Sequence, residues 1–148
     1  MPSAKASPFK VLNEGQAEGS TIRLTAPLNI WGGLDPASGM IVDPRHPQYG
    51  LCLAGHIVLT PPTRGSGTNA QIFAQACARG VGPAAVVLFA PDYVVAVGAM
   101  VAKRLYGLQC PVIAGPDDGW DEHASVVLRV SAAAQGAAKI TVVSASSS

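Results

Sequence analysis

The chain has 148 residues, of which 49% are hydrophobic and 13% are charged, and its formal net charge is +1. This composition supplies enough apolar material for the core of one domain and excludes a disordered chain. The sequence has no basic run and few aromatic residues, so we expect no nucleic-acid partner. The longest apolar stretches, residues 84–90 and 94–102, are too short to cross a membrane, and no signal-peptide pattern is present. We therefore expect a cytoplasmic protein without a membrane partner.

The first half of the chain predicts three short strands. Alternating apolar residues predict a half-buried strand over residues 20–25, and residues 40–43 form a shorter strand after the Gly39 turn. A loop rich in glycine and proline lies between them. A β-branched run predicts a third strand over residues 56–60, which must end at Pro61 because proline cannot donate to a ladder.

The next part of the chain is more regular. Apolar spacings predict a helix over residues 68–79, followed by a buried strand over residues 84–89. We expect Asp92 to cap a second helix that ends at Gly107, and residues 111–114 to form the next strand. Strand, helix and strand in this succession indicate parallel pairing with a right-handed crossover.

Two alternating segments, residues 125–130 and 138–143, predict an antiparallel hairpin at the end of the chain. The predicted fold is therefore α/β, with a mixed sheet and few helices in a single domain. We expect residues 1–8 to be a flexible N-terminus, residues 9–143 to be the domain and residues 144–148 to be a flexible tail.

The turn before the first predicted helix carries Arg64 and Ser66. Backbone N–H groups and the positive end of the dipole favour an anion at a helix start. The turn matches neither a Walker loop nor a dinucleotide fingerprint, and the chain has no G-x-S-x-G element. On the residues alone, the serine remains a nucleophile, a base or a cap. A serine hydrolase would need His46, His56 or His123 within hydrogen-bond reach of it.

A second group of polar residues lies in the earlier loop, where Asp35, Asp43 and His46 fall within a dozen residues of one another. The simpler interpretation is a packed loop in which Trp31 covers the core and the aspartates cap turns. In the functional interpretation, this loop is a substrate-facing wall beside Ser66, with His46 as an acid or base.

The three cysteines are far apart in the sequence, at positions 52, 77 and 110, and no histidine lies at ligand spacing from any of them. We interpret them as buried thiols and expect no metal site in this chain.

Several segments, taken in order, resemble the small subunit of the aconitase X dehydratases. The resemblance rests on residues 27–36 (PLNIWGGLDP), Gly39, Asp43, residues 46–47, Gly50, residues 53–55 and 64–66, residues 83–87, Gly98, residues 105–107 and residues 111–112. It spans nearly the whole chain, and its W-G-G-x-D-P element is distinctive.

This resemblance implies a single swivelling β/β/α domain with a mixed sheet or barrel-like core, which docks on a larger subunit and closes the active site. The large subunit would carry an iron or iron–sulfur centre. The family removes water from cis-3-hydroxy-L-proline or from mevalonate 5-phosphate, so the other partner would be a small anionic or zwitterionic hydroxy acid. The composition favours the hydroxyproline substrate. A non-catalytic swivelling domain that binds an anion or a partner is the alternative of a different class.

The resemblance also implies site residues. Ser66 matches the serine that serves the superfamily as proton acceptor, and the helix start with Arg64 would stabilise its alkoxide. The expected substrate-binding residues are Arg64, Gly65, Gly67, Thr68 and Asn69. The expected site loop comprises Trp31, Gly32, Gly33, Asp35 and His46. Gly67 departs from the family, which usually carries a second serine or a similar residue there, and it allows a ligand to approach the backbone closely.

A domain that closes over a partner must bury a surface there. We expect an exposed apolar surface in the site loop, with Trp31, Ile30 and Leu34 as its candidates.

Overall fold

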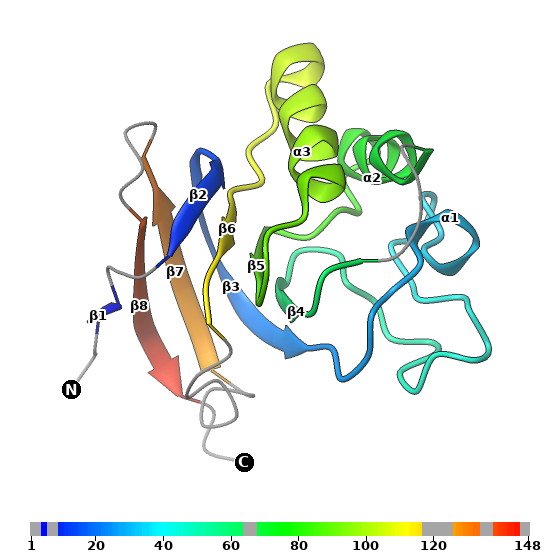
Figure 1. Ribbon diagram of the computed structural model, residues 1–148, viewed down its shortest axis with the longest axis horizontal. Coiled ribbons are helices and arrows are strands. Elements are labelled where there is room, and N and C mark those ends of the chain that lie inside the picture. The colour runs from blue at the N-terminus through cyan, green and yellow to red at the C-terminus, as the bar shows by residue number, and fades with distance from the viewer. Residues whose placement is uncertain (1–3, 6–8, 64–67, 117–125, 134–137, 146–148) are drawn as a thin grey trace.

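The computed structural model describes residues 4–5, 9–63, 68–116, 126–133 and 138–145. Its elements in chain order are β1 (Ala4–Lys5), β2 (Lys10–Asn13), β3 (Gly15–Arg23), α1 (Ile30–Gly33), β4 (Ile57–Thr60), α2 (Thr68–Ala78), β5 (Ala85–Leu88), α3 (Tyr93–Tyr106), β6 (Val112–Ala114), β7 (Val126–Ala132) and β8 (Ala138–Ala145). Figure 1 shows the helices together on one side of the strands.

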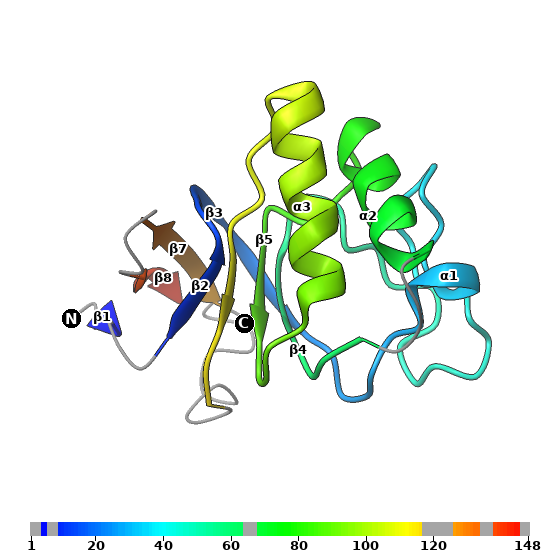
Figure 2. The same ribbon diagram turned by 45° about the horizontal axis from the view of Figure 1, so that its top comes forward.

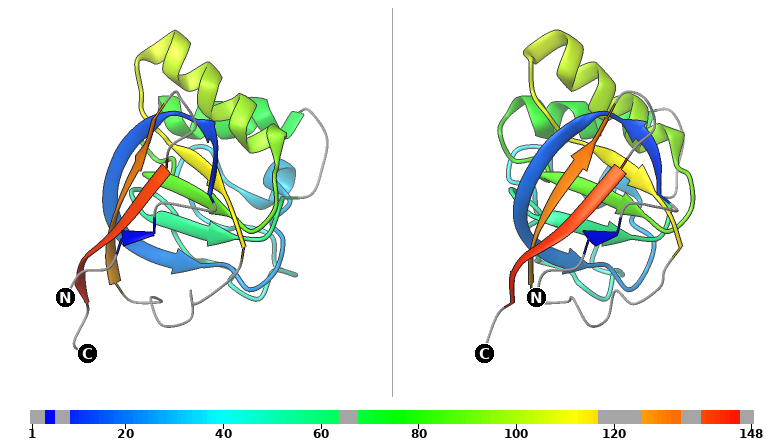
Figure 3. Two further views of the ribbon diagram at one scale, coloured as in Figure 1. Left: turned by 60° about the vertical axis from the view of Figure 1, so that its left-hand side comes forward. Right: turned by 90° about the vertical axis from the view of Figure 1, so that its left-hand side faces the viewer.

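The strands form one mixed sheet in the order β1-β8-β7-β3-β4-β5-β6-β2. β3, β4, β5 and β6 run parallel, whereas the pairs at both ends of the sheet are antiparallel. β3 joins the two parts, because residues 15–20 pair with β7 and residues 21–23 pair with β4. Gly19 stands at this change of partner, where a Cβ atom would lie 2.8 Å from the Gly55 carbonyl oxygen. Seen from the side, the sheet curls into a barrel-like shape (Figure 3).

Two apolar cores lie on opposite faces of the parallel strands. In β4, Val58 belongs to the core beneath the helices, while Ile57 and Leu59 belong to the core shared with β7 and β8. All four residues of β4 are buried, as expected for a strand covered on both faces. α2 and α3 lie side by side over the parallel strands (Figure 2). The β/β/α layering expected from the family resemblance is confirmed.

The predicted helix ends are confirmed at α3. The Oδ1 atom of Asp92 accepts hydrogen bonds from the backbone of Val94 at 3.0 Å and of Val95 at 3.4 Å. Gly107 ends the helix in the left-handed conformation, with φ of +68°. The closing hairpin of β7 and β8 is also antiparallel, as predicted.

The strand predicted at residues 40–43 is wrong. Only isolated bridges occur there, between Leu34 and Ile41 and between Met40 and Cys52, because the segment folds back on its own loop. Gly39 forces this turn, since its φ is +78° and a Cβ atom would lie 2.4 Å from the Val81 carbonyl oxygen. The short strands β1 and β2 were not predicted.

Candidate functional site

The parallel strands β3, β4, β5 and β6 all end at one edge of the sheet, and α2 and α3 begin there. We call this the site edge. Ligands of α/β sheets bind beyond the carboxyl ends of the strands, so this edge is the place to look for a site. In the sequence, Arg64, Gly65, Ser66 and Gly67 come between β4 and α2, but they lie outside the described residues.

The residue before the turn is fixed to α3. The backbone N–H of Thr63 donates to Oδ2 of Asp92 at 2.7 Å, and the Thr63 hydroxyl donates to the same oxygen. Because the other oxygen caps α3, both oxygens of this buried carboxylate are occupied. Asp92 therefore joins the entry of the turn to the start of a second helix.

The residues after the turn connect it to the expected site loop. Thr68 is exposed, whereas Asn69 is buried in the first turn of α2. Oδ1 of Asn69 accepts the backbone N–H of Trp31 at 2.9 Å. The structure thus brings two predicted site residues together, although 38 positions separate them. The side-chain oxygen of Asn69 binds the backbone of the site loop.

The Trp31-Gly32-Gly33 segment is a single kinked turn that carries an exposed indole. Trp31 is 61% exposed, so the interpretation in which it covers the core is wrong. Gly32 has φ of +80°, which favours glycine at this position. Ile30 and Leu34 are buried in the core, so only Trp31 of the expected apolar surface is exposed.

The aspartates of the loop cap turns. Oδ1 of Asp35 accepts the backbone N–H of Ala37 at 3.0 Å, and Oδ2 accepts the Ser38 hydroxyl at 2.7 Å. These two hydrogen bonds hold the pKa of Asp35 below its ordinary value. The backbone N–H of Arg45 lowers the pKa of Asp43 in the same way.

Both ring nitrogens of His46 have partners. Nδ1 accepts the backbone N–H of Gln48 at 3.0 Å, and Nε2 lies 3.1 Å from the Ala26 carbonyl oxygen, which assigns the proton to Nε2. The ring is buried. The geometry therefore matches a structural histidine that fixes the loop.

The two described histidines, His46 and His56, give no support to a serine hydrolase. His46 uses both nitrogens within its loop, and His123 lies outside the described residues. His56 precedes β4, so a strand of four residues, about 13 Å, separates it from the site edge. Its buried Nδ1 has no hydrogen-bond partner in the described part of the chain.

Two features of this edge were not predicted from the sequence. The guanidinium of Arg23, at the end of β3, lies 4.9 Å from the centre of the Phe89 ring, which places a cation among the strand ends. The buried Oδ1 of Asn29 accepts no hydrogen bond from the described residues. Asn29 directly precedes α1, which carries Trp31, Gly32 and Gly33 of the site loop.

The described residues do not fit an iron or iron–sulfur centre, because they bring no three His, Cys, Asp or Glu side chains together. Cys52 is exposed, which corrects the interpretation of all three cysteines as buried. Cys77 and Cys110 are buried; their mutual hydrogen bond, and then burial, raise the pKa of Cys110. Among the described helices, none has the length and apolar character needed to cross a membrane.

Comparison with known proteins identifies the family of this fold. A family model described as the aconitase X swivel domain matches residues 7–140. The crystal structure of Thermococcus kodakaraensis aconitase X in its holo-form superposes with a TM-score of 0.76 at 23% identity, covering 93% of this chain and 99% of that one. That likeness supports the same fold.

Two curated relatives carry functional names. Over 103 residues the chain is 36% identical to the cis-3-hydroxy-L-proline dehydratase of Pseudomonas aeruginosa, covering 70% of this chain but 18% of that protein. Over 93 residues it is 30% identical to the phosphomevalonate dehydratase small subunit of Methanothermobacter thermautotrophicus, covering 63% of this chain and 71% of that subunit. The chain therefore belongs to the aconitase X swivel-domain family.

Proposed function

We propose that this chain is the small, swivelling part of a dehydratase and that Ser66 is its proton acceptor. One observation carries the proposal: the described residues on both sides of the Ser66 turn are anchored at the site edge. Thr63 is held by Asp92 before the turn, and Asn69 is held against Trp31 after it. A catalytic group needs such support, because small displacements of a reacting atom cost much of the rate.

The location gives a serine a physical reason to act as a base. A hydroxyl accepts a proton efficiently only when negative charge on its oxygen is stabilised nearby. Ser66 precedes α2 by two positions, and the free N–H groups and dipole of an 11-residue helix favour negative charge at its start. Arg64 supplies a positive charge in the same turn.

We propose cis-3-hydroxy-L-proline as the substrate, with mevalonate 5-phosphate as the alternative. The bacterial relative of higher identity is named for the first, and the archaeal small subunits are named for the second. Both compounds carry a carboxylate, which suits a site edge bearing Arg23 and a helix start.

We assign the iron centre implied by the family to a larger partner, because the described residues offer no group of ligands for it. This chain would contribute the base and part of the substrate site. Neither half alone should turn over substrate.

The test is turnover by the reconstituted complex carrying Ser66→Ala. Loss of a general base typically costs about 10²–10⁴-fold in rate, so kcat should fall by that order while the complex still assembles. Ser20→Ala is the matched control, since Ser20 is exposed on β3 and should leave kcat unchanged. Wild-type turnover in Ser66→Ala, with weaker assembly, would favour the non-catalytic swivelling domain instead.

A further inference from the structure

Helix α3 is apolar on the face that points away from the sheet. Its inner face, with Val95, Ala99 and Ala102, belongs to the core beneath the helices. Its outer apolar residues are between 36% and 67% exposed and follow i, i+4, i+7, i+8 and i+12 spacing: Tyr93, Val97, Met100, Val101 and Leu105. Surface helices of single domains normally carry polar residues there. We call these five residues, with Arg104, the α3 surface.

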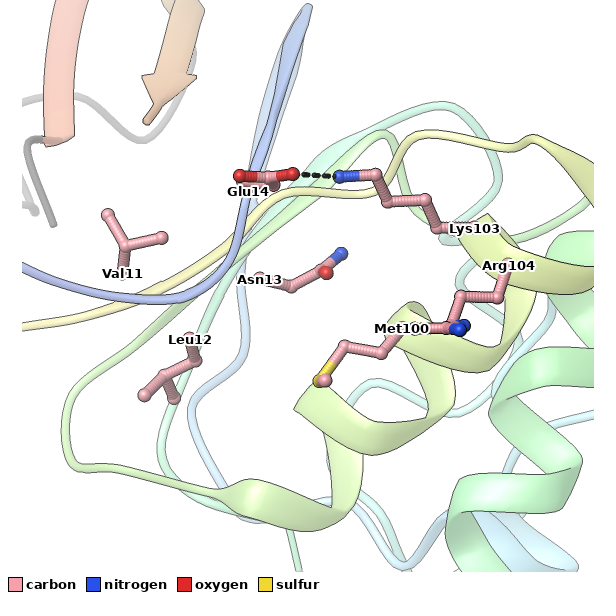
Figure 4. A pocket seen from close by; sticks show the side chains of 7 residues that line it. All are labelled: Val11, Leu12, Asn13, Glu14, Met100, Lys103 and Arg104. Carbon is pink, nitrogen blue, oxygen red and sulfur yellow. Dashed lines mark hydrogen bonds and ion pairs between the residues drawn. The ribbon is translucent and has the colours of Figure 1, made fainter. Parts of the chain in front are cut away.

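A groove runs beside this surface. It has a volume of about 510 Å³ and lies between α3 and β2, with Met100 and Arg104 on one wall and Leu12 and Glu14 on the other (Figure 4). The Lys10 ammonium donates to the Tyr93 hydroxyl at 3.1 Å near the start of the helix. The ion pair of Lys103 and Glu14, at 2.6 Å, lies near its end.

Arg104 leaves the α3 surface with an unpaired positive charge among the described residues. α3 carries Lys103 and Arg104 and no acidic residue. Glu14 is engaged by Lys103, and Arg104 forms no ion pair or hydrogen bond with any residue that the structure describes. From α3 and the groove, a second copy would add a second Arg104 and no unpaired carboxylate. A partner that presents an apolar surface with a carboxylate would be complementary.

The α3 surface alone is smaller than the contact that a stable complex usually needs. A helix of 14 residues is about 21 Å long and about 10 Å wide, so it presents roughly 200 Å² in projection. Each partner of a stable complex usually contributes about 800 Å². The α3 surface therefore needs an adjoining contact, and Tyr93 follows Asp92 directly at the site edge. A partner that covers the site edge and α3 together would bury more area than one that covers α3 alone.

We propose that the α3 surface docks the large subunit of the dehydratase through an apolar patch with a carboxylate opposite Arg104. The inference rests on the proposed two-part function and adds where the halves meet. Tyrosine, methionine and arginine, the residue types enriched in interface cores, are all present on the α3 surface.

The test measures the affinity of the purified large subunit for variants of this chain by calorimetry. Val97→Glu and Arg104→Glu should each raise the Kd by at least about tenfold. Val143→Glu is the matched control, because Val143 on β8 is 42% exposed, close to the 47% of Val97, and should change the Kd by less than about twofold. Circular dichroism and the melting temperature establish that each variant is folded.

The possible results distinguish failure of the docking surface from failure of the proposed two-part dehydratase. Failure of the wild-type chain to bind the large subunit would overturn the two-part function, and the docking surface with it. Wild-type affinity in both Val97→Glu and Arg104→Glu would overturn the docking surface and leave the function standing. A dimer of the isolated chain that Val97→Glu dissociates, with unchanged affinity for the large subunit, would make a second copy the occupant and also overturn the inference.

Discussion

The Asp92 carboxylate links α3 to the segment that follows β4. One of its oxygens caps α3, and the other accepts the backbone N–H of Thr63. The cap was predictable, since an aspartate precedes an apolar helix. The Thr63 contact was not, because 29 positions separate the two residues and no local pattern marks the pair.

Thr63→Val should lower the free energy of unfolding by about 1–3 kcal/mol, because it leaves a buried carboxylate oxygen with one donor fewer. Thr63→Ser keeps the hydroxyl and is the control, with a stability near wild type. Urea unfolding of the two variants measures the difference. Equal stability of the valine and serine variants would show that the hydroxyl contact does not stabilise the fold.

Asp35 makes the stability of its loop depend on pH. Its hydrogen bonds with Ala37 and Ser38 lower the pKa of the folded state beneath the ordinary value of 3.8. The charged form therefore stabilises the fold above pH 3.8, and this contribution is lost as the pH falls through the lowered pKa.

Asp35→Asn should accordingly be less stable than wild type at pH 7, and the difference should shrink as the pH falls below 3.8. Denaturant unfolding of both proteins across this range measures it. A difference that stays constant down to the lowest pH would contradict the assignment.

At the scale of elements, α2 and α3 approach each other closely at Gly98. A Cβ atom there would lie 2.7 Å from the Ala70 carbonyl oxygen and 3.1 Å from the Phe73 side chain. Because the Ala70 carbonyl belongs to the α2 backbone, a larger side chain at position 98 would push the whole helix away. This glycine therefore sets the spacing of the two helices that begin at the site edge.

Gly98→Ala should therefore destabilise the protein by about 1–3 kcal/mol, although alanine has the higher helix propensity by about 1 kcal/mol. Val101→Ala, at an exposed position of the same helix, gains propensity without a close contact and serves as the control. Thermal unfolding compares them. A stability of Gly98→Ala at or above wild type would show that the helices tolerate a wider separation.

The elements that were predicted correctly are those whose ends are marked by capping or strand-breaking residues in the sequence. α3 has an aspartate cap and a terminal glycine, and β4 and β5 are apolar runs bounded by proline or glycine. β2 has only four residues, so its apolar pattern is too short to predict a strand. It forms by pairing with β6, which is distant in the sequence. The segment at residues 40–43 has a strand-like composition, but loop contacts determine its conformation.

At the scale of the whole molecule, the family resemblance correctly predicted the layering. Of the three candidates for an exposed apolar surface in the site loop, only Trp31 is exposed. Ile30 and Leu34 are buried, because the kinked turn directs them into the core and leaves Trp31 outside. The larger exposed apolar face is on α3. Because both faces of α3 are apolar, the sequence does not show which face is buried. The packing of the helix on the sheet decides this.

The central claim is that this domain supplies the base to a dehydratase completed by a larger partner. The most direct measurement is turnover of cis-3-hydroxy-L-proline and mevalonate 5-phosphate, side by side, by each half alone and by the reconstituted complex. We predict turnover only by the complex, with cis-3-hydroxy-L-proline as its substrate, and its loss in Ser66→Ala. Turnover by this chain alone, or none of either compound by an assembled complex, would contradict the account.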